Sequence, residues 1–291
     1  MGPPAPADPT VTLPAIAVVC TACGGAGRVT VRDWRCACGA AWTPVVPPFD
    51  PGAIAHGTRT VWRYAANLPP LGPVPPVTLG EGGTPLADVP LAGRRVWAKL
   101  EHLQPSGAYK DRGAAVLAAA LAGSGVTDAV EDSSGNAGAS LAACLARAGI
   151  ALRLFVPAGT PVAKRRQALA HGAVVVADAP SRQAATDRAQ AAIGPATAYA
   201  SHVYSPWFLA GQMTLAWEIW EDLGRRAPDH VVVPAGHGLL LLGLYHGFEA
   251  LARAGLVERV PALHGAQADA CAPLAAAFAR GAAAPVPAAP R

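Results

Sequence analysis

The residue with the clearest chemical potential in this sequence is Lys110. Only three of the 23 basic side chains are lysines, and Lys110 lies in the turn-rich run Gln104–Gly113 (QPSGAYKDRG), directly before the alanine-rich stretch Ala114–Ala122. A lysine amine can lose its proton and attack a carbonyl carbon, which an arginine guanidinium cannot do. We therefore predict a covalent site at Lys110. The alternative is a solvated lysine in the first turn of a helix.

A second run of interest is Glu131–Ser140 (EDSSGNAGAS), which follows a short apolar stretch and precedes another alanine-rich helical pattern. Small residues at a strand-to-helix turn leave backbone N–H groups open to an anionic ligand. Ser133, Ser134 and Gly135 are therefore predicted to contact a substrate. Asn136 adds an amide that both donates and accepts hydrogen bonds. An ordinary turn with a helix cap is the alternative.

A third run, Val231–Gly243 (VVVPAGHGLLLLG), changes from β-branched residues to an apolar helical pattern at Pro-Ala-Gly-His-Gly. This change suits a loop that binds a phosphate at the N-terminus of a helix. A lone G-x-G is weak evidence, and a simple left-handed turn is the alternative. The predicted loop consists of Ala235, Gly236, His237, Gly238 and Leu239.

Four cysteines near the N-terminus have the spacing of a metal site. Cys20-x-x-Cys23 and Cys36-x-Cys38 are separated by 12 residues rich in turn-forming and β-forming types. Four thiols this close in a reducing compartment favour Zn²⁺ over disulfides, and the spacing is similar to that of a zinc ribbon. Because the second pair is C-x-C, cysteines without a metal remain the alternative.

Composition sets the broad class of the protein. With 291 residues and 52% hydrophobic residues, the chain can bury one sizeable core or two smaller ones. The net charge of +4 comes from scattered arginines, which argues against nucleic-acid binding. The sequence has no apolar stretch long enough for a membrane span, and Met1–Pro9 is unlike a secretory signal. A cytoplasmic location is the default expectation.

The pattern of the remaining chain predicts an α/β fold. The β-rich runs Leu152–Val156, Ala173–Val176 and His230–Val233 alternate with alanine-rich helical stretches. Such alternation indicates βαβ units and parallel sheets. The proline-punctuated segment Thr43–Pro76 is predicted to be an arm that crosses the surface.

Taken in this order, the three glycine-containing runs resemble those of the fold-type II pyridoxal-phosphate enzymes of the tryptophan synthase beta-like superfamily, and most closely the threonine synthase branch. The resemblance extends from about Leu79 to Leu274 and includes Leu79–Leu86 (LGEGGTPL) and Lys164–Gln167 before His171–Ala173. It implies a two-domain fold-type II enzyme with parallel sheets, preceded by the zinc-ribbon-like module.

The resemblance also implies boundaries for these parts. Residues 1–43 would form a proline-rich tail and the zinc-ribbon-like cysteine module. Residues 44–105 plus 202–291 would form a large, C-terminally incomplete pyridoxal-phosphate domain. Residues 106–201 would form a small domain that closes over the substrate.

Specific roles follow from the same resemblance. Lys110 would bind pyridoxal 5′-phosphate as a Schiff base and would later transfer the substrate proton. Asn136 would hydrogen-bond the 3-oxygen of the cofactor ring, and the loop Ala235–Leu239 would bind the cofactor phosphate through backbone amides. Schiff-base chemistry needs these three elements, an amine, an amide and a rigid anion site, whatever the family.

One segment departs from the threonine synthase pattern. In Ser205–Thr214 (SPWFLAGQMT), Phe208 and Met213 stand where that branch has an arginine and a lysine that bind the substrate phosphate. Apolar side chains cannot supply the charge-assisted hydrogen bonds that a dianion needs. This favours an amino acid without a phosphate, such as serine or threonine. Three histidines are candidates for replacement contacts, namely His102, His202 and His237.

The end of the chain is a second departure, because the related enzymes continue through further βα units. Here the sequence stops in the low-complexity run Ala282–Arg291. An incomplete sheet would leave a strand edge unpaired. We therefore expect a truncated product, a fragment, or a pseudoenzyme that a partner completes.

These observations lead to one predicted function and two alternatives. The prediction is a pyridoxal-phosphate-dependent carbon–oxygen lyase that acts on a small L-amino acid, threonine synthase-like, converting O-phosphohomoserine to threonine and phosphate. The first alternative is β-elimination of the serine or threonine dehydratase type. The second is a truncated, non-catalytic protein with a binding or regulatory role. The family suggests a homodimer.

Overall fold

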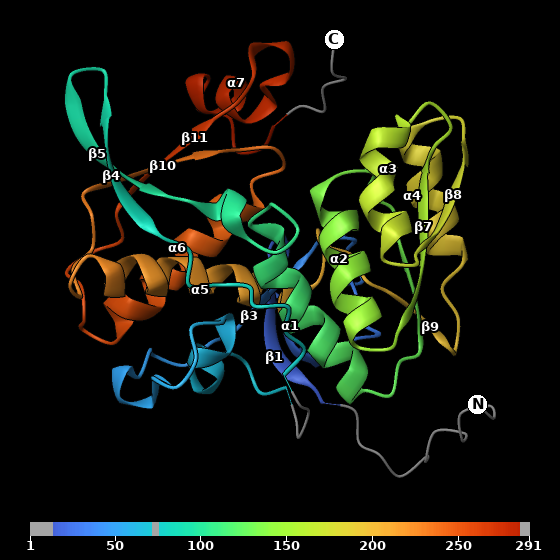
Figure 1. The fold of residues 1–291 in the computed structure, drawn as a ribbon, viewed down its shortest axis with the longest axis horizontal. Coiled ribbons are helices and arrows are strands. Elements are labelled where there is room, and N and C mark those ends of the chain that lie inside the picture. Colours follow the sequence, from blue (N-terminus) through green and yellow to red (C-terminus); the bar gives the residue numbers. More distant parts are fainter. Residues whose placement is uncertain (1–13, 72–75, 286–291) are drawn as a thin grey trace.

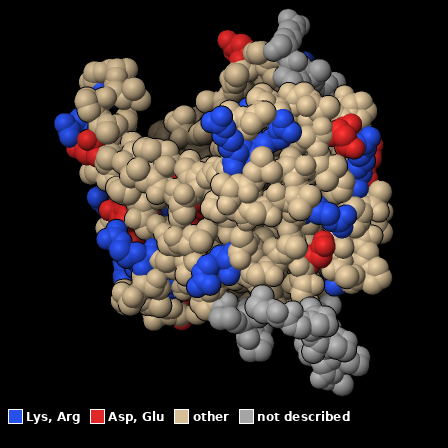
Figure 2. Space-filling model, turned by 45° about the vertical axis from the view of Figure 1, so that its right-hand side comes forward, with Lys and Arg blue, Asp and Glu red and all other residues tan. Residues whose placement is uncertain are grey.

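The computed structural model describes residues 14–71 and 76–285 of the chain. The proline-rich stretch Met1–Pro9 and the last residues of the C-terminal low-complexity run lie outside the described residues. Figure 2 shows basic and acidic side chains distributed over one face among broad uncharged areas, as expected for scattered arginines. None of the helices in the described ranges has both the length and the apolar character needed to cross a bilayer.

A four-stranded parallel sheet forms one half of the molecule (Figure 1), and its strand order is β8-β7-β6-β9. Its strands are β6 (Asp128–Glu131), β7 (Ala151–Pro157), β8 (Val174–Ala179) and β9 (Thr197–Tyr199). Its connecting helices are α2 (Asn136–Arg147), α3 (Val162–Ala170) and α4 (Arg182–Ala191). The predicted βαβ units and parallel sheet are confirmed.

Alternation along β7 explains why helices cover both faces of this sheet. Leu152 and Leu154 belong to the main hydrophobic cluster together with Leu141 of α2, whereas Phe155 packs in a separate cluster with Ala189 of α4. Successive side chains of a strand point to opposite faces, so a strand that is apolar on both sides needs a helix on each.

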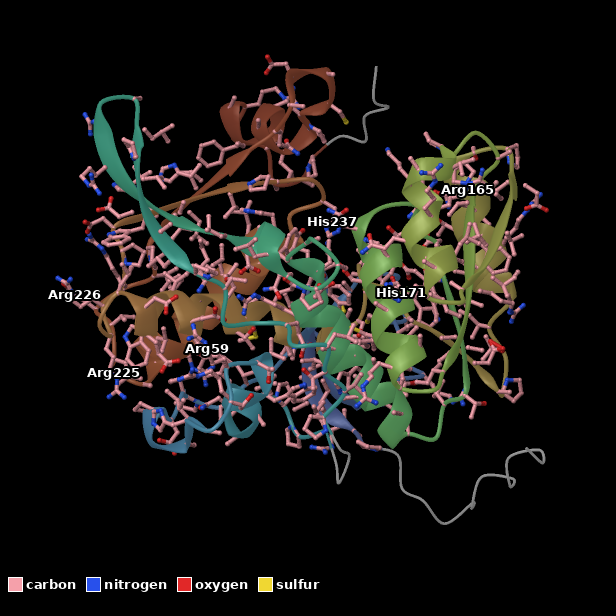
Figure 3. All side chains as sticks on the ribbon, in the orientation of Figure 1. Arg59, Arg165, His171, Arg225, Arg226 and His237 are labelled. Carbon is pink, nitrogen blue, oxygen red and sulfur yellow. The ribbon has the colours of Figure 1, made fainter. Side chains whose placement is uncertain are left out.

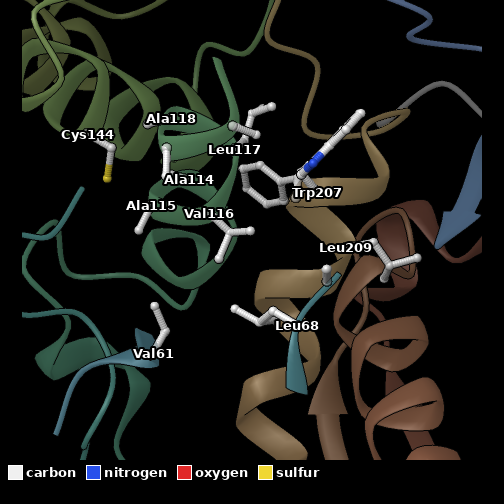
Figure 4. Packing of buried hydrophobic residues seen from close by; sticks show 14 of the residues in the cluster. Val61, Leu68, Ala114, Ala115, Val116, Leu117, Ala118, Cys144, Trp207 and Leu209 are labelled. Atoms are coloured by element: carbon white, nitrogen blue, oxygen red, sulfur yellow. The ribbon is translucent and has the colours of Figure 1, made fainter. Parts of the chain in front are cut away.

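The other half of the molecule is built around α5 (Pro206–Asp222), of which residues 206–220 are all buried. Helix α5 packs between α1 (Lys110–Gly123) and α6 (Leu239–Arg253). Figure 4 shows Leu117 of α1 beside Trp207 of α5.

Glycines allow this close approach of α1 to α5. A Cβ on Gly113 would lie 2.3 Å from the Phe208 ring, and one on Gly211 would lie 2.3 Å from the Arg112 carbonyl oxygen. Both distances are far below van der Waals contact. Glycine at these two positions therefore sets how closely α1 and α5 approach.

Smaller sheets complete this half. These are the antiparallel hairpin of β4 (Leu86–Leu91) and β5 (Arg94–Lys99) and the parallel pair of β10 (His230–Pro234) and β11 (Ala262–Ala266), which α7 (Pro273–Ala279) follows (Figure 1). The antiparallel sheet β2-β1-β3 precedes them in the chain. Its strands are β1 (Ile16–Cys20), β2 (Ala26–Val29) and β3 (Trp42–Pro44), and the short 3₁₀ helices of the chain are Pro51–Ala53, Val61–Asn67, Glu101–Leu103 and Asp269–Cys271.

The segment Thr43–Pro76 does not follow its prediction as a surface arm. Phe49 and Tyr64 pack against the Trp217 ring of α5, with ring centroids 5.0 and 5.5 Å apart. Prolines interrupt the periodicity of the segment in the sequence, which hides its core residues. Its buried core residues include Val46, Phe49, Ile54, Val61, Trp62, Tyr64 and Leu68.

The domain boundaries at residues 105/106 and 201/202 stay predictions. The interval between them contains α1 and the whole four-stranded sheet. Helix α1 packs against α5, outside the interval, as well as against α2 within it.

A buried ion-pair network fixes the N-terminal part of α1. The Arg112 side chain is fully buried, with Nη1 2.7 Å from Glu218 Oε2 and Nη2 2.7 Å from Glu101 Oε1. Lys99 Nζ lies 2.7 Å from the other Glu218 oxygen. Burial by itself raises the pKa of a carboxyl, but Arg112 and Lys99 outweigh it and lower the pKa of Glu218 to about 2. This stabilisation is present above the ordinary carboxyl pKa and is lost as pH falls toward 2.

We expect Arg112→Ala to lower the free energy of unfolding by about 3–5 kcal/mol, because it leaves the Glu101 carboxylate without its cation and the buried Glu218 with Lys99 alone. The measurement is urea unfolding at pH 7. The control is Arg95→Ala in β5, which removes an exposed pair with Asp88 and costs less than about 1 kcal/mol. Equal losses in the two variants would contradict a structural role of the buried network.

Candidate active site

Lys110 is buried at the start of α1 and is only 7% exposed. Its Nζ is 4.8 Å from the centroid of the Tyr109 ring and 5.8 Å from that of Phe208. Burial lowers the pKa of the amine to about 8, although the nearby Glu131 carboxyl opposes the shift. At neutral pH a sizeable fraction of this amine is therefore uncharged and nucleophilic.

His237 lies next to this amine, with its Nε2 3.2 Å from Lys110 Nζ. The other ring nitrogen, Nδ1, accepts a hydrogen bond from the Leu239 backbone N–H at 3.3 Å. Burial and the charge of Lys110 lower the pKa of His237 to about 4, so its imidazole is neutral at pH 7. With Nδ1 acting as acceptor, the ring proton is on Nε2 and is donated to an uncharged lysine amine.

The sequence-predicted loop Ala235–Leu239 connects β10 to α6, and Figure 3 shows His237 between the two halves of the molecule. Gly238 caps α6 with a φ of 90°, a left-handed conformation that favours glycine. The Gln267 amide donates to the carbonyl oxygens of Ala235 and Gly236, at 2.9 and 3.2 Å. These bonds fix the loop carbonyls and leave the N-terminus of α6 to face Lys110.

The second predicted run forms the loop between β6 and α2. Ser133 and Ser134 are half-buried, Gly135 and Asn136 are exposed, and Asn136 begins α2. A Cβ on Gly138 would lie 2.1 Å from the Ser133 carbonyl oxygen, so α2 packs tightly on this loop. Among the described residues, no hydrogen bond joins the loop to Lys110.

The acid that precedes this loop was not identified as a functional residue from the sequence. Glu131 ends β6 and is fully buried, and its Oε1 lies 2.6 Å from Nδ1 of His202. The His202 ring lies 5.1 Å from that of His237, measured between centroids. Burial raises the pKa of Glu131 well above its usual value and lowers the pKa of His202 well below its usual value. A carboxylic acid at the end of a buried strand was the signal available in the sequence.

Asp132 holds the start of the same loop in place. One of its carboxylate oxygens accepts from the Tyr199 hydroxyl at 2.9 Å, and the other accepts from Thr186 at 2.6 Å and from Arg182 at 2.9 Å. Asp132 is thus held by hydrogen bonds from β9 and α4, and the loop before α2 has a fixed starting point.

The structure brings together some of the other sequence candidates and separates one. Phe208 and Met213 are fully buried in α5, and Phe208 is near Lys110. His202 and His237 are neighbours, as described above. His102 is exposed in a 3₁₀ helix, and within residues 14–71 and 76–285 no contact joins it to Lys110.

The four cysteines of the N-terminal module are brought together by the sheet β2-β1-β3. The Sγ atoms of Cys20 and Cys38 are 3.4 Å apart, those of Cys23 and Cys36 are 3.8 Å apart, and all four lie within 4.8 Å of one another. Four thiolates about 2.3 Å from a tetrahedral Zn²⁺ would be separated by roughly 3.8 Å. Hydrogen bonds from the backbone N–H groups of Cys23 and Ala22 lower the pKa of Cys20 to about 6.

Comparison with known proteins gives a consistent result. A family model described as "Pyridoxal-phosphate dependent enzyme" matches residues 77–291. The threonine synthase of Methanosarcina acetivorans is 32% identical over 234 residues, 78% of this chain and 57% of the relative. That of Methanocaldococcus jannaschii is 33% identical over 224 residues, 75% of this chain and 55% of the relative. The chain thus spans little more than half the length of these relatives.

Solved structures with the same fold include enzymes that are named for different reactions. A serine racemase from maize has a TM-score of 0.60 at 25% identity, covering 70% of this chain and 61% of that one. An L-serine ammonia-lyase from Rhizomucor miehei has a TM-score of 0.60 at 23% identity, covering 68% of this chain and 64% of that one. The second likeness concerns the fold alone.

Proposed function

This chain belongs to the pyridoxal-phosphate-dependent enzyme family, and we propose that it is a carbon–oxygen lyase, threonine synthase-like in sequence, that acts on a small L-amino acid. The observation that carries the proposal is the buried amine of Lys110, whose pKa is lowered to about 8 by burial. A buried lysine whose pKa is lowered toward neutrality suits Schiff-base formation better than it suits structural ion pairing.

The residues around this amine fit the cofactor. Lys110 would bind it covalently, and the amide of Asn136 is exposed at the N-terminus of α2, where it can reach a ligand. A Cβ on Gly236 would meet nothing within 4 Å, so no side chain or backbone crowds this point of the loop, where the N-terminus of α6 would bind a phosphate. His237 would hold its ring beside this phosphate loop. When bound, the cofactor stabilises negative charge at the substrate α-carbon.

The chain's own groups would perform the proton transfer. The uncharged Lys110 amine would take the proton from the substrate α-carbon, since a general base must be deprotonated and close to its target. The β6–α2 loop with Ser133, Ser134 and Gly135 would bind the substrate carboxylate through its N–H groups, as helix N-termini do for anions. Tyr109 and Phe208 would exclude water from this side of the amine.

Two substrates are supported by different observations. Identities of about one third to several threonine synthases support O-phosphohomoserine, with threonine and phosphate as products. The buried, apolar Phe208 and Met213 support a hydroxy amino acid without a phosphate, which would undergo β-elimination to a 2-oxo acid and ammonia. An uncompensated dianion beside two apolar side chains is strongly disfavoured.

We also infer that the four-cysteine cluster of Cys20, Cys23, Cys36 and Cys38 binds one Zn²⁺ with a structural role. All four Sγ atoms lie close enough to share one ion, and this set provides four protein ligands with no open position for a substrate.

We expect pyridoxal 5′-phosphate to give a Schiff-base absorption band, roughly 410–430 nm, in the wild type and in Lys164→Ala, but not in Lys110→Ala. Borohydride trapping and peptide mapping should place the label on Lys110. The rate of band formation should rise with pH and reach half its maximum near pH 8, because the reactive form is the deprotonated amine. A band that persists in Lys110→Ala would contradict the covalent role and would favour the non-catalytic alternative.

A direct comparison of substrates should distinguish the two reactions. We expect L-threonine or L-serine to give a 2-oxo acid with kcat/KM at least about tenfold above that for phosphate release from O-phosphohomoserine, because each lost charge-assisted hydrogen bond is worth about 1.5–3 kcal/mol. Both products can be measured with the same loaded enzyme. Faster phosphate release would instead support the threonine synthase reaction.

The purified protein should contain one equivalent of zinc, and Cys36→Ser should lose it, as measured by elemental analysis. The control Cys144→Ala removes a buried thiol of α2 outside the cluster and should keep the metal. A chelator should lower the Tm of the wild type but not that of Cys36→Ser. Full zinc content in Cys36→Ser would rule out the four-thiolate site.

A further inference from the structure

The buried pair of Glu131 and His202 has a geometry that the lyase function, as described so far, does not use. Parallel pairing of β6 with β9 sets Val130 opposite Tyr199, so the carboxyl ends of the two strands lie side by side. Glu131 ends the first strand and His202 follows the second. The topology thus brings a carboxyl and an imidazole to one edge of the sheet, where they meet at 2.6 Å.

Glu131 keeps one buried polar atom without a hydrogen-bond partner. This atom is Oε2, which makes no hydrogen bond in the part of the chain that the structure describes. Leaving a buried polar atom unsatisfied costs free energy, so such atoms in a native protein call for a functional explanation. The pair is therefore poorly explained by stability.

The pair lies close to residues that surround the lysine. The His202 ring lies 5.1 Å from the His237 ring, which contacts Lys110 Nζ, and 6.1 Å from the Phe208 ring, measured between centroids. Electrostatic interactions link Lys110 to both His202 and Glu131. A substrate that reaches the Lys110 amine would therefore lie near the His202 ring.

We propose that Glu131 and His202 form a proton relay in which His202 protonates the departing hydroxyl group of the substrate and Glu131 replaces the proton. This inference rests on the proposed lyase function and assigns it a hydroxyl leaving group. His202 would be a catalytic residue that touches the substrate, and Glu131 would act through it.

The relay delivers one proton to the substrate through two linked transfers and does not create a buried imidazolium. Burial raises the pKa of Glu131 and lowers that of His202, which favours the neutral form of both groups. In that form the Glu131 hydroxyl would donate to Nδ1, and the ring proton would be on Nε2. As Nε2 gives its proton to the leaving oxygen, Nδ1 receives the proton of Glu131. The result is a neutral histidine and a Glu131 carboxylate.

The charges created by the reaction would stabilise each other. Lys110 becomes positive when it takes the α-proton, and Glu131 becomes negative when it gives up its own. Each of these two charges favours the charged form of the other group. The remaining groups that act on the pair are Asp132, Arg182 and His237, and the first two of these neutralise each other in an ion pair.

Atoms and electrons balance in this step for L-serine. The bond between the β-carbon and oxygen breaks, its electron pair stays with oxygen, and the proton from Nε2 converts the departing group to water. The α-proton goes to Lys110, and the released enamine takes up water to give pyruvate and ammonia. No oxidant or reductant is needed.

A substrate with a leaving group that needs no proton tests the relay. Chloride departs from β-chloro-L-alanine as a stable anion, and elimination from it and from L-serine gives the same product. We expect His202→Gln to lower kcat/KM for L-serine by about 10²–10⁴-fold and that for β-chloro-L-alanine by less than about threefold. The control His171→Gln changes an exposed histidine after α3 (Figure 3) and should affect neither substrate.

The outcomes separate the relay from a structural role and from the lyase function itself. Equal losses on both substrates, or no loss on either, would overturn the relay. A wild type that acts on O-phosphohomoserine or β-chloro-L-alanine but not on serine or threonine would overturn the relay and leave a lyase. A wild type inactive on all four would overturn both proposals.

A measurement on the protein without cofactor tests the pair independently of activity. The short hydrogen bond between Glu131 and His202 should give a strongly deshielded proton resonance in the wild type and in His171→Gln. This resonance should be absent in both Glu131→Gln and His202→Gln, provided that their Tm shows them to be folded. Its persistence in either variant would show that the pair does not share this proton.

Discussion

The position of the reactive amine depends on a buried guanidinium two residues further along the chain. Arg112 is fully enclosed between Glu101 and Glu218, which come from a 3₁₀ helix and from α5. A buried arginine is tolerated only when its donors are paired, so these three segments must meet at one place. Asp111 adds a second restraint, because its carboxylate accepts from the Ser106 backbone N–H at 2.6 Å, before the helix begins. Lys110 therefore enters the site from a helix end that cannot shift.

The same enclosure determines the chemistry available to the side chains nearby. Burial disfavours every charged form, and the pKa shifts of Lys110, His237 and Glu131 all move toward neutrality. A site of uncharged acids and bases suits a reaction that moves protons between fixed positions. Charge is then created only in pairs of opposite sign, and the low dielectric strengthens the attraction within each pair.

Much of the fold and part of the site were accessible from sequence because they depend on local pattern. Alternating β-branched and alanine-rich runs predict βαβ units, and β7, β8 and β10 lie where those runs predicted strands. The scarcity of lysine drew attention to Lys110. The glycine-containing runs indicated the N-termini of α2 and α6. The segment Thr43–Pro76 was misjudged, because its core residues are spaced irregularly between prolines. Its burial depends on the aromatic surface of α5, which is distant in the sequence.

The sequence by itself determined the reactive groups and the types of element that carry them, since residue chemistry and hydrophobic periodicity are local properties. The tertiary structure decided which groups share an environment. Glu131 and His202 are 71 positions apart and meet only because β6 and β9 are paired in parallel. His237 reaches Lys110 across 127 positions through the packing of α6 and α1 on opposite sides of α5. Strand order and helix packing are set by the burial of the whole chain, and no short stretch of sequence contains that information.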